Sequence, residues 1–292
     1  MRKEPFFSIV IPTHNRPAQL KECLHSISML DYPRDRFEVV VVDDRSEVTP
    51  SSIIDPFRHL IDVMLLQNQK AGPAAARNAG AAHAKGRFLA FTDDDCLPQP
   101  LWLRAFAECL QLYPDAAVGG HTSNALEDNI HSTASQLLID YIYSYYNADD
   151  GGAQFFASNN LTLPREAFFK MGGFDDSFPL AAAEDRDFCE RWRQYGGRLR
   201  HAPKAVMAHA RPLTFRNFIR QHFNYGRGAF HFHRLRKNRN QGKLQIEPAS
   251  FYYNLLKSGL KEEKRAVRLV GLLFLSQIAN AAGFYTAKLV SD

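Results

Sequence analysis

A run of β-branched residues, Phe37–Val42 (FEVVVV), constrains the fold more than any other segment of the chain. A strand that is apolar on both faces is typical of a parallel sheet covered by helices. Ser8–Ile11, which is closed by Pro12, has the same character. Between these two segments, Pro17–Met29 carries apolar residues at helical spacing. The first forty residues therefore predict a strand, a helix and a second strand.

The same alternation continues through the first hundred residues. We expect strands at Val63–Leu66 and Arg87–Phe91, with an alanine-rich helix at Gly72–Ala84 between them. Strands that alternate with helices form βαβ units. The pattern predicts an α/β fold with a Rossmann-like, mostly parallel central sheet flanked by helices.

The second half of the chain is less regular. We expect a strand at Ala116–Gly120, a loop at Asp149–Gly152, and helices at Ser132–Tyr146, Ala183–Tyr195 and Leu213–Arg236. The last of these helices is basic, and we expect an interruption at its two glycines, Gly226 and Gly228.

Acidic residues follow two of the predicted strands. Asp43 and Asp44 end the second strand, and Asp93–Asp95 end the fourth. In open parallel sheets, ligands bind outside the carboxyl ends of the strands, so we expect both clusters at one edge. Adjacent carboxylates repel each other, and a divalent cation offsets this repulsion. Three acids exceed what a turn or helix cap needs, so we predict an Mn²⁺ or Mg²⁺ site that also binds a diphosphate.

Basic residues are concentrated in one stretch. Arg191–Ile246 contains fourteen Lys or Arg and no Asp or Glu, which predicts a partner carrying phosphates: nucleotide, anionic lipid or nucleic acid. The four cysteines show no CxxC spacing, which argues against a zinc site or a disulfide framework. The N-terminal segment lacks the features of a secretory signal, so we expect a cytoplasmic protein.

Six segments, in order through about residues 7 to 230, resemble the family 2 glycosyltransferases, which have the GT-A fold. They are SIVIPTHNRPAQLKECLHSI, VVVVDDRS, GPAAARNAG, FLAFTDDDC with its DxD motif, NNLTLPREAFFKMGGFDDSF and AEDRDFCERW. The resemblance implies a metal-dependent transfer of a sugar from a nucleotide diphosphate-sugar to an acceptor hydroxyl, with inversion at the anomeric carbon.

The resemblance also implies roles for individual residues. Asp185 would be the catalytic base, and Asp95 with His209 would hold the metal. Asp43 would lie at the nucleobase and Asp44 near the sugar. The full set of residues that it implies for substrate binding is Pro12, Thr13, Asn15, Arg16, Asp43, Asp44, Arg77, Asp93, Asp94 and Glu184.

The resemblance divides the chain into a GT-A catalytic domain at 1–246 and a helical C-terminal extension at 247–292. Within the domain, about 1–120 would bind the nucleotide-sugar and about 121–246 the acceptor. We expect a UDP-sugar donor, transfer of a hexosyl or N-acetylhexosaminyl group, and a carbohydrate or lipid-linked acceptor in polysaccharide or glycolipid biosynthesis. RQHFNYGRG, at 220–228, lacks the tryptophan of the QxxRW element of processive relatives, which argues against processive synthesis.

Two other functions share part of this pattern. A nucleotidyltransferase also uses metal-binding acids on a parallel sheet, but PTHNRP is not the glycine-rich phosphate loop expected after its first strand. A nucleic-acid-binding protein would explain the aromatic residues within the basic stretch. Acids at the strand ends argue against a nucleic-acid groove there, so we expect no nucleic-acid partner.

A segment of nineteen residues without a charge, Leu269–Ala287, lies near the end of the chain. It could pack on the catalytic body or in a homo-oligomer, lie on a membrane, or span it, and its length is marginal for a span. Because basic residues precede it, we expect peripheral association with the cytoplasmic face of the membrane.

Overall fold

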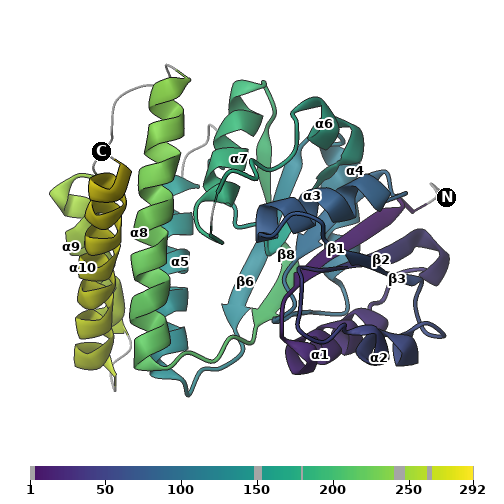
Figure 1. The fold of residues 1–292 in the computed structure, drawn as a ribbon, viewed down its shortest axis with the longest axis horizontal. Coiled ribbons are helices and arrows are strands. Elements are labelled where there is room, and N and C mark those ends of the chain that lie inside the picture. Colours follow the sequence, from purple (N-terminus) through teal and green to yellow (C-terminus); the bar gives the residue numbers. More distant parts are fainter. Residues whose placement is uncertain (1–3, 148–152, 179, 240–246, 262–264, 292) are drawn as a thin grey trace. The chain divides into compact units, whose positions relative to one another are not determined.

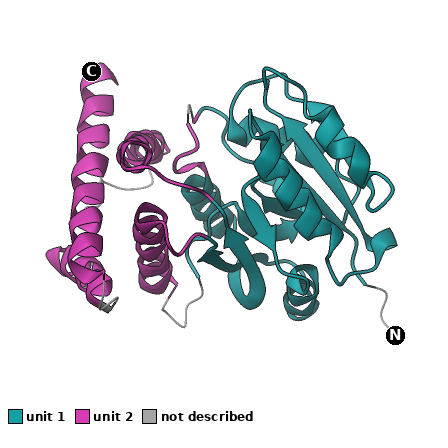
Figure 2. Ribbon diagram, turned by 90° about the horizontal axis from the view of Figure 1, so that it is seen from below, with its two compact units in different colours: residues 1–125, 149–177, 185–210 teal, residues 126–148, 178–184, 211–292 magenta. Residues whose placement is uncertain are grey.

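The computed structural model describes residues 4–147, 153–178, 180–239, 247–261 and 265–291. The chain forms two compact units, each built from separate parts of the sequence (Figure 2). Unit 1 comprises 1–125, 149–177 and 185–210, and unit 2 comprises 126–148, 178–184 and 211–292. The expected loop at 149–152, the end of the basic stretch at 240–246 and the domain boundary after residue 246 lie outside the described residues.

Unit 1 contains an eight-stranded sheet in the order β3-β2-β1-β4-β7-β6-β8-β5. In this order β7 and β5 run antiparallel to their neighbours, and the other pairs are parallel. The expected mostly parallel sheet is confirmed. The strands are β1 (Phe7–Thr13), β2 (Phe37–Asp43), β3 (Val63–Gln67), β4 (Phe88–Thr92), β5 (Cys96–Pro98), β6 (Ala117–Asn124), β7 (Asn160–Pro164) and β8 (Leu199–His209).

Helices cover both faces of this sheet, as Figure 1 shows for α1 and α2 on one side and α3 on the other. The helical segments associated with the sheet are α1 (Pro17–Ser28), η1 (Arg34–Arg36), α2 (Ser51–Ile54), η2 (Asp55–Phe57), α3 (Pro73–His83), α4 (Trp102–Leu112), α6 (Arg165–Lys170) and α7 (Glu184–Gln194).

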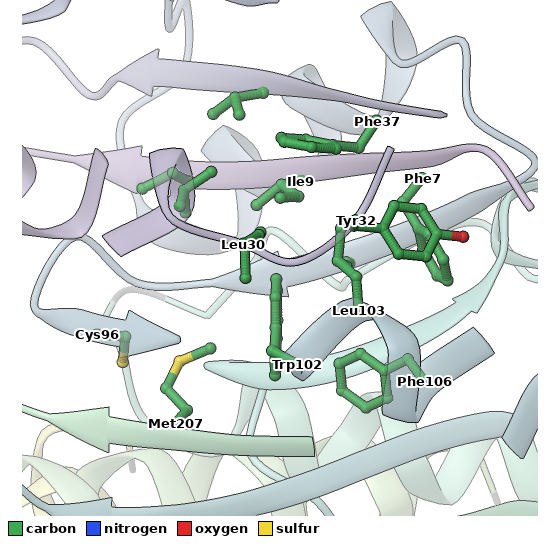
Figure 3. Packing of buried hydrophobic residues seen from close by; sticks show 14 of the residues in the cluster. Phe7, Ile9, Leu30, Tyr32, Phe37, Cys96, Trp102, Leu103, Phe106 and Met207 are labelled. Carbon is green, nitrogen blue, oxygen red and sulfur yellow. The ribbon is translucent and has the colours of Figure 1, made fainter. Parts of the chain in front are cut away.

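The alternation of side chains along the central strands explains why these strands have no polar face. In β2, Val39 and Val41 pack in the cluster formed with α1 and α4, whereas Val40 and Val42 pack against Ala76 of α3. The larger cluster contains Phe7, Tyr32, Trp102 and Met207 among others (Figure 3). Both faces are therefore buried, which is the arrangement that the FEVVVV pattern predicted.

Most of the expected elements are present, with different ends. The first strand was expected to end at Ile11, but it continues through Pro12. Its pairing with β4 stops at Val10 and only β2 pairs with it beyond that point, so the proline interrupts no pairing with β4. Neither α4 nor the short strand β5 was expected from the sequence. A three-residue strand is too short to show any periodicity, so β5 is defined by its pairing with β8 alone.

Unit 2 is helical in its described residues, with α5 (Ile130–Tyr146), α8 (Phe215–Asn238), α9 (Ala249–Ser258), η3 (Gly259–Lys261) and α10 (Ala266–Ser291). The expected interruption of the basic helix is wrong, since α8 runs unbroken through both glycines. Gly226 is required by packing: a Cβ there would lie 1.8 Å from the carbonyl oxygen of Asn280 in α10. The glycine allows two helices to approach closely and does not break either of them.

The C-terminal helix that the sequence predicted is present as α10. Among the described residues it is the helix that is long and apolar enough to cross a membrane, and a third of its most apolar window is buried in the protein. Length and composition alone do not separate a membrane helix from a core helix.

Candidate active site

The two acidic clusters meet at the carboxyl edge of the sheet, because β1 lies between β2 and β4. Thr13, the last residue of β1, contacts both clusters. Its carbonyl oxygen accepts a hydrogen bond from the backbone N–H of Asp44 (2.8 Å), and its hydroxyl donates to Asp94 Oδ2 (2.8 Å). The expectation that the clusters share one edge is therefore confirmed.

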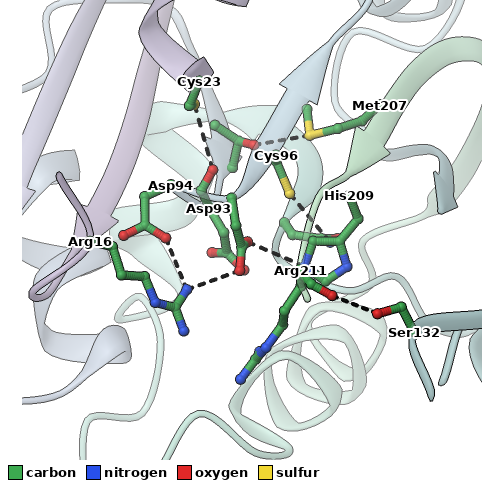
Figure 4. Close-up of polar contacts among 12 residues, drawn as sticks. Arg16, Cys23, Asp93, Asp94, Cys96, Ser132, Met207, His209 and Arg211 are labelled. Atoms are coloured by element: carbon green, nitrogen blue, oxygen red, sulfur yellow. Dashed lines mark hydrogen bonds and ion pairs between the residues drawn. The ribbon is translucent and has the colours of Figure 1, made fainter. Parts of the chain in front are cut away.

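Two arginines compensate the charge of the three adjacent aspartates, and Figure 4 shows the first of them, Arg16, beside Asp94. Arg16 donates to Asp94 Oδ1 (3.0 Å) and to Asp95 Oδ2 (2.9 Å). Arg77, which is buried in α3, donates to Asp93 Oδ1 (2.6 Å). Each carboxylate thus has a guanidinium partner, and these charge-assisted bonds orient the cluster.

Arg16 does not fully offset the cost of a charge on Asp94, whose side chain is almost fully buried. Burial raises the pKa of Asp94 to about 6, with a further contribution from the charge of Asp95, although Arg16 and the Thr13 hydroxyl act in the opposite direction. Near neutral pH, keeping this carboxylate ionised costs folding free energy.

The acids that follow β2 differ in exposure. Asp43 is fully buried and accepts from the backbone N–H of Ser46 (2.9 Å) and from Gln67 (3.2 Å). Asp44 accepts from Asn68 (2.8 Å) and from the N–H of Gly72 (2.9 Å), which has a φ of 118°. The left-handed backbone at this glycine turns its N–H toward the carboxylate.

An open pocket of about 410 Å³ lies beside Asp44, and His14, Arg45 and Ala71 also line it. Asp44 is thus the acid of this pair that faces a space large enough for part of a ligand. Contact between Asp43 and a ligand would require Ser46 or Gln67 to give way.

The loop after β1 is fixed by hydrogen bonds to the loop after β2. Asn15 has a φ of 53°, its N–H donates to the Ser46 hydroxyl (2.9 Å), and its side-chain oxygen accepts from the N–H of Glu47 (2.9 Å). Pro12 precedes this loop in register with Val42. The loop that carries Arg16 is therefore held against the strand end that carries the acids.

The last of the three aspartates, Asp95, also belongs to a group with metal-ligating atoms. The ligand atoms of Asp95, Cys96 and His209 all lie within 4.8 Å of one another, and Asp95 Oδ1 is 3.2 Å from His209 Nε2. Two ligands at right angles around an ion with bonds of about 2.1 Å would be about 3 Å apart. The carboxylate and imidazole therefore fit a divalent cation, in chemistry and in spacing.

Asp185 lies in the first turn of α7 and accepts from the backbone N–H of Arg186 (2.8 Å). Burial raises the pKa of Asp185, and the N–H of Arg186 and the charge of Arg77 act in the opposite direction. Arg77 therefore acts electrostatically on Asp185 while it binds Asp93. Glu184, the preceding residue, is buried, whereas Asp185 is partly exposed.

Two residues at this edge, Cys96 and Asn159, were not among the site residues expected from the sequence. Cys96 directly follows the acids, but its partner His209 comes from β8, and only the pairing of Cys96 with His209 brings them together. Asn159 donates to Cys96 Sγ at 3.8 Å. The sequence DDDC could have pointed to Cys96, because a cysteine that directly follows three acids can join them in binding a metal. For Asn159 the sequence offers only its position directly before a strand.

Comparison with known sequences gives one family and several relatives. The profile described as Glycosyl transferase family 2 matches residues 8–172, which is more than half of the chain. Glycosyltransferase AglE of Haloferax volcanii is 26% identical over 227 residues, which are 77% of this chain and 73% of that protein. Other curated relatives are longer than this chain, and the matched part spans 56% or less of the length of each.

Comparison with solved structures gives two further similarities. The mannosyltransferase PcManGT from Pyrobaculum calidifontis, in complex with GDP-Man and Mn²⁺, has a TM-score of 0.66 at 20% identity and covers 99% of this chain and 81% of that chain. S. aureus TarS 1-349, in complex with UDP-GlcNAc, has a TM-score of 0.54 at 18% identity and covers 98% of this chain and 91% of that chain. At these identities the likeness concerns the fold.

Proposed function

The chain belongs to glycosyl transferase family 2, with the GT-A fold and glycosyltransferase activity of that family, and we propose that it is an inverting, metal-dependent enzyme. The proposed reaction transfers a sugar from a nucleotide diphosphate-sugar to an acceptor hydroxyl. One observation carries the proposal: an open pocket beside Asp44, the metal-ligating atoms of Asp95 and His209, and Asp185, whose pKa responds to the charge of Arg77, gather at the carboxyl edge of one sheet.

The donor's nucleoside is proposed to bind in the pocket lined by Asp44. Asp44 supplies a carboxylate to hydroxyl or amide donors, and Asn15 fixes the loop that closes this side. Asp43 acts as a positioning residue, since its bonds to Ser46 and Gln67 hold the strand end. Pro12 and Thr13 extend the same edge toward the acids.

The donor's diphosphate is proposed to lie beside Asp93–Asp95. Asp95 and His209 would hold an Mn²⁺ or Mg²⁺ ion, which supplies positive charge where the leaving diphosphate develops negative charge. Arg16 and Arg77 contribute two further positive charges beside these acids. Asp94 supports the arrangement through its bonds to Thr13 and Arg16.

Asp185 is proposed as the general base that removes the proton from the acceptor hydroxyl. Its raised pKa favours proton uptake, and Arg77 limits the rise so that the carboxylate form is retained for catalysis. A single displacement at the anomeric carbon inverts the configuration and needs no second nucleophile.

The test is a panel of UDP- and GDP-sugars assayed for release of the nucleoside diphosphate, with Mn²⁺, with Mg²⁺ and with excess EDTA. The relatives' structures with GDP-Man and UDP-GlcNAc motivate both carriers. We propose a UDP-hexose or UDP-N-acetylhexosamine as the donor. Activity should disappear in EDTA and return with Mn²⁺; full activity in EDTA would exclude the metal role of Asp95.

The Asp185 role is tested by Asp185→Asn, with Glu190→Gln on the same helix as the matched control. Turnover should fall by about 10²- to 10⁴-fold in Asp185→Asn, while donor binding measured by calorimetry stays close to that of the wild type. Normal turnover in a folded Asp185→Asn protein would assign the base elsewhere, with Glu184 next to be tested.

We propose peripheral membrane association through α10, consistent with a lipid-linked acceptor and a cytoplasmic location at the membrane face. One side of α10 is apolar and exposed along its length, at Val267, Phe274, Leu275, Ile278, Tyr285 and Leu289. Unit 2 carries fifteen Lys or Arg against eight Asp or Glu, whereas unit 1 carries 21 against 23. An apolar stripe on a basic unit is suited to an anionic membrane surface.

This stripe alone is too small for a stable homo-oligomer interface. From residue 267 to 289 the stripe is about 33 Å long and about 10 Å wide, which gives roughly 330 Å². A standard interface needs about 800 Å² from each partner.

Flotation with anionic liposomes tests the membrane proposal. It should recover the wild type and the control Leu112→Asp, but not Ile278→Asp. No flotation of the wild type at low salt would refute membrane binding.

A further inference from the structure

The metal-ligating group at the sheet edge contains a sulfur atom as well as oxygen and nitrogen. Cys96 is paired directly with His209 across β5 and β8, so the two side chains lie on the same face of the sheet. Asp95 immediately precedes Cys96, and the ligand atoms of all three lie within 4.8 Å of one another. Figure 4 shows Cys96 and His209 side by side.

This donor set suits a borderline-soft ion better than a hard one. Mg²⁺ takes oxygen ligands, whereas Zn²⁺ and Co²⁺ accept thiolate, imidazole and carboxylate together. In a tetrahedral zinc site, with Zn–S of about 2.3 Å and Zn–N of about 2.0 Å, neighbouring ligand atoms lie about 3.3 to 3.6 Å apart. No pair of ligand atoms in the observed group exceeds this spacing by more than about 1.5 Å.

The arginine and the imidazole contact different oxygens of Asp95. Arg16 binds Asp95 through Oδ2, whereas His209 contacts Oδ1, so an ion that replaces the second contact does not have to displace the arginine. Asn159 donates to Cys96 Sγ, and its side-chain oxygen is buried with no hydrogen-bond partner among the described residues. A buried acceptor with no donor beside this group is consistent with a bound ion that carries a water molecule.

We propose that Asp95, Cys96 and His209 form a Zn²⁺ site that competes with Mn²⁺ or Mg²⁺ for the same carboxylate and imidazole. Zinc binding releases the thiol proton of Cys96 to solvent and forms the Zn–S bond. A four-coordinate ion with three protein ligands keeps one open position, which is too few for a diphosphate to bind through two oxygens. Zinc therefore inhibits sugar transfer; this regulatory role rests on the proposed function, but the binding itself does not.

The test is a Co²⁺ titration of the full, metal-free protein, because cobalt bound to a thiolate gives a near-ultraviolet charge-transfer band. The wild type and the control Cys109→Ser should show the band, and Zn²⁺ should abolish it at one equivalent. Cys96→Ser should lack the band, and its half-inhibitory Zn²⁺ concentration in the Mn²⁺-dependent assay should rise at least about tenfold. Absence of the band in the wild type, or its persistence in Cys96→Ser, would overturn the proposal.

Two controls separate this proposal from the proposed enzyme function and from misfolding. The cobalt band requires no turnover, so it tests the site even if no donor in the panel is used. If Cys96→Ser does not fold, X-ray absorption of the zinc-loaded wild type decides the matter. A sulfur neighbour at about 2.3 Å supports the site, and a shell of only oxygen and nitrogen refutes it.

Discussion

Asp94 gives a prediction whose size follows from the structure. Its usual pKa is 3.8, and burial raises the pKa to about 6 in the folded protein. Below pH 3.8 the carboxyl is protonated in both states. Between pH 3.8 and 6 the unfolded chain loses the proton and the folded chain keeps it, so the free energy of unfolding falls by about 3 kcal/mol, at 1.36 kcal/mol for each pKa unit.

Asp94→Asn removes this loss while it keeps the shape of the side chain. The difference in unfolding free energy between variant and wild type should be small at pH 4 and should reach about 3 kcal/mol in favour of the variant at pH 7. Urea unfolding in the presence of EDTA at pH 4, 5, 6 and 7 measures it. Both tryptophans, Trp102 and Trp192, are buried in unit 1, so their fluorescence reports the unit that contains Asp94.

Asp31→Asn is the matched control, because a hydrogen bond from exposed Arg104 lowers the pKa of Asp31. Its stabilisation is present above the usual pKa and is lost as the pH falls, so the sign of its pH dependence is opposite to that of Asp94. If the unfolding free energies of wild type and Asp94→Asn keep a constant difference from pH 4 to 7, Asp94 is better solvated or better compensated than its contacts indicate, and its pKa is not raised.

Three further predictions concern single side chains. Gly226→Ala should destabilise unit 2 by roughly 2 to 3 kcal/mol, because the new methyl would overlap the Asn280 carbonyl and force α8 and α10 apart; unchanged melting by circular dichroism would contradict this. Burial lowers the pKa of His222 to about 4, so the unfolding free energy of the wild type should fall by about 3 kcal/mol as the pH falls from 6.5 to 4. The unfolding free energy of His222→Phe should not show this fall. Equal acid sensitivity of the two proteins would refute the prediction. Arg77→Lys keeps the positive charge but loses the planar contact with Asp93, so kcat/KM should fall roughly tenfold or more. The control Arg87→Lys, at an exposed position, should leave kcat/KM unchanged. Equal kcat/KM in Arg77→Lys and the wild type would show that Arg77 does not act in the site.

The central sheet was predictable because its signal is local. Each of the strands β1 to β4 contains a continuous apolar run, and the helices α1 and α3 have a periodicity or composition of their own. Burial on both faces favours apolar residues at successive positions, so the strands are recognisable without knowledge of their neighbours. The short strand β5 has no such signal, since it exists only through its pairing with β8.

The position of the acids was predictable for a related reason. A parallel sheet places the carboxyl ends of its strands at one edge, and Asp43, Asp44 and Asp93–Asp95 all follow strands directly. The partners of these acids were not predictable. Arg16 and Arg77 come from separate loops and helices, and which carboxylate each one binds depends on side-chain geometry.

The sequence by itself determined the α/β class, the order of the first four strands and helices along the chain, and the edge at which carboxylates gather. These follow from side-chain periodicity and from the direction of parallel strands. Only the tertiary structure decided that Asp94 is buried enough to hold a proton up to about pH 6, that Asp43 is enclosed while Asp44 faces a pocket, and that Cys96 lies beside His209. Desolvation and ligand distance depend on atoms from distant parts of the chain, and no local pattern in the sequence encodes them.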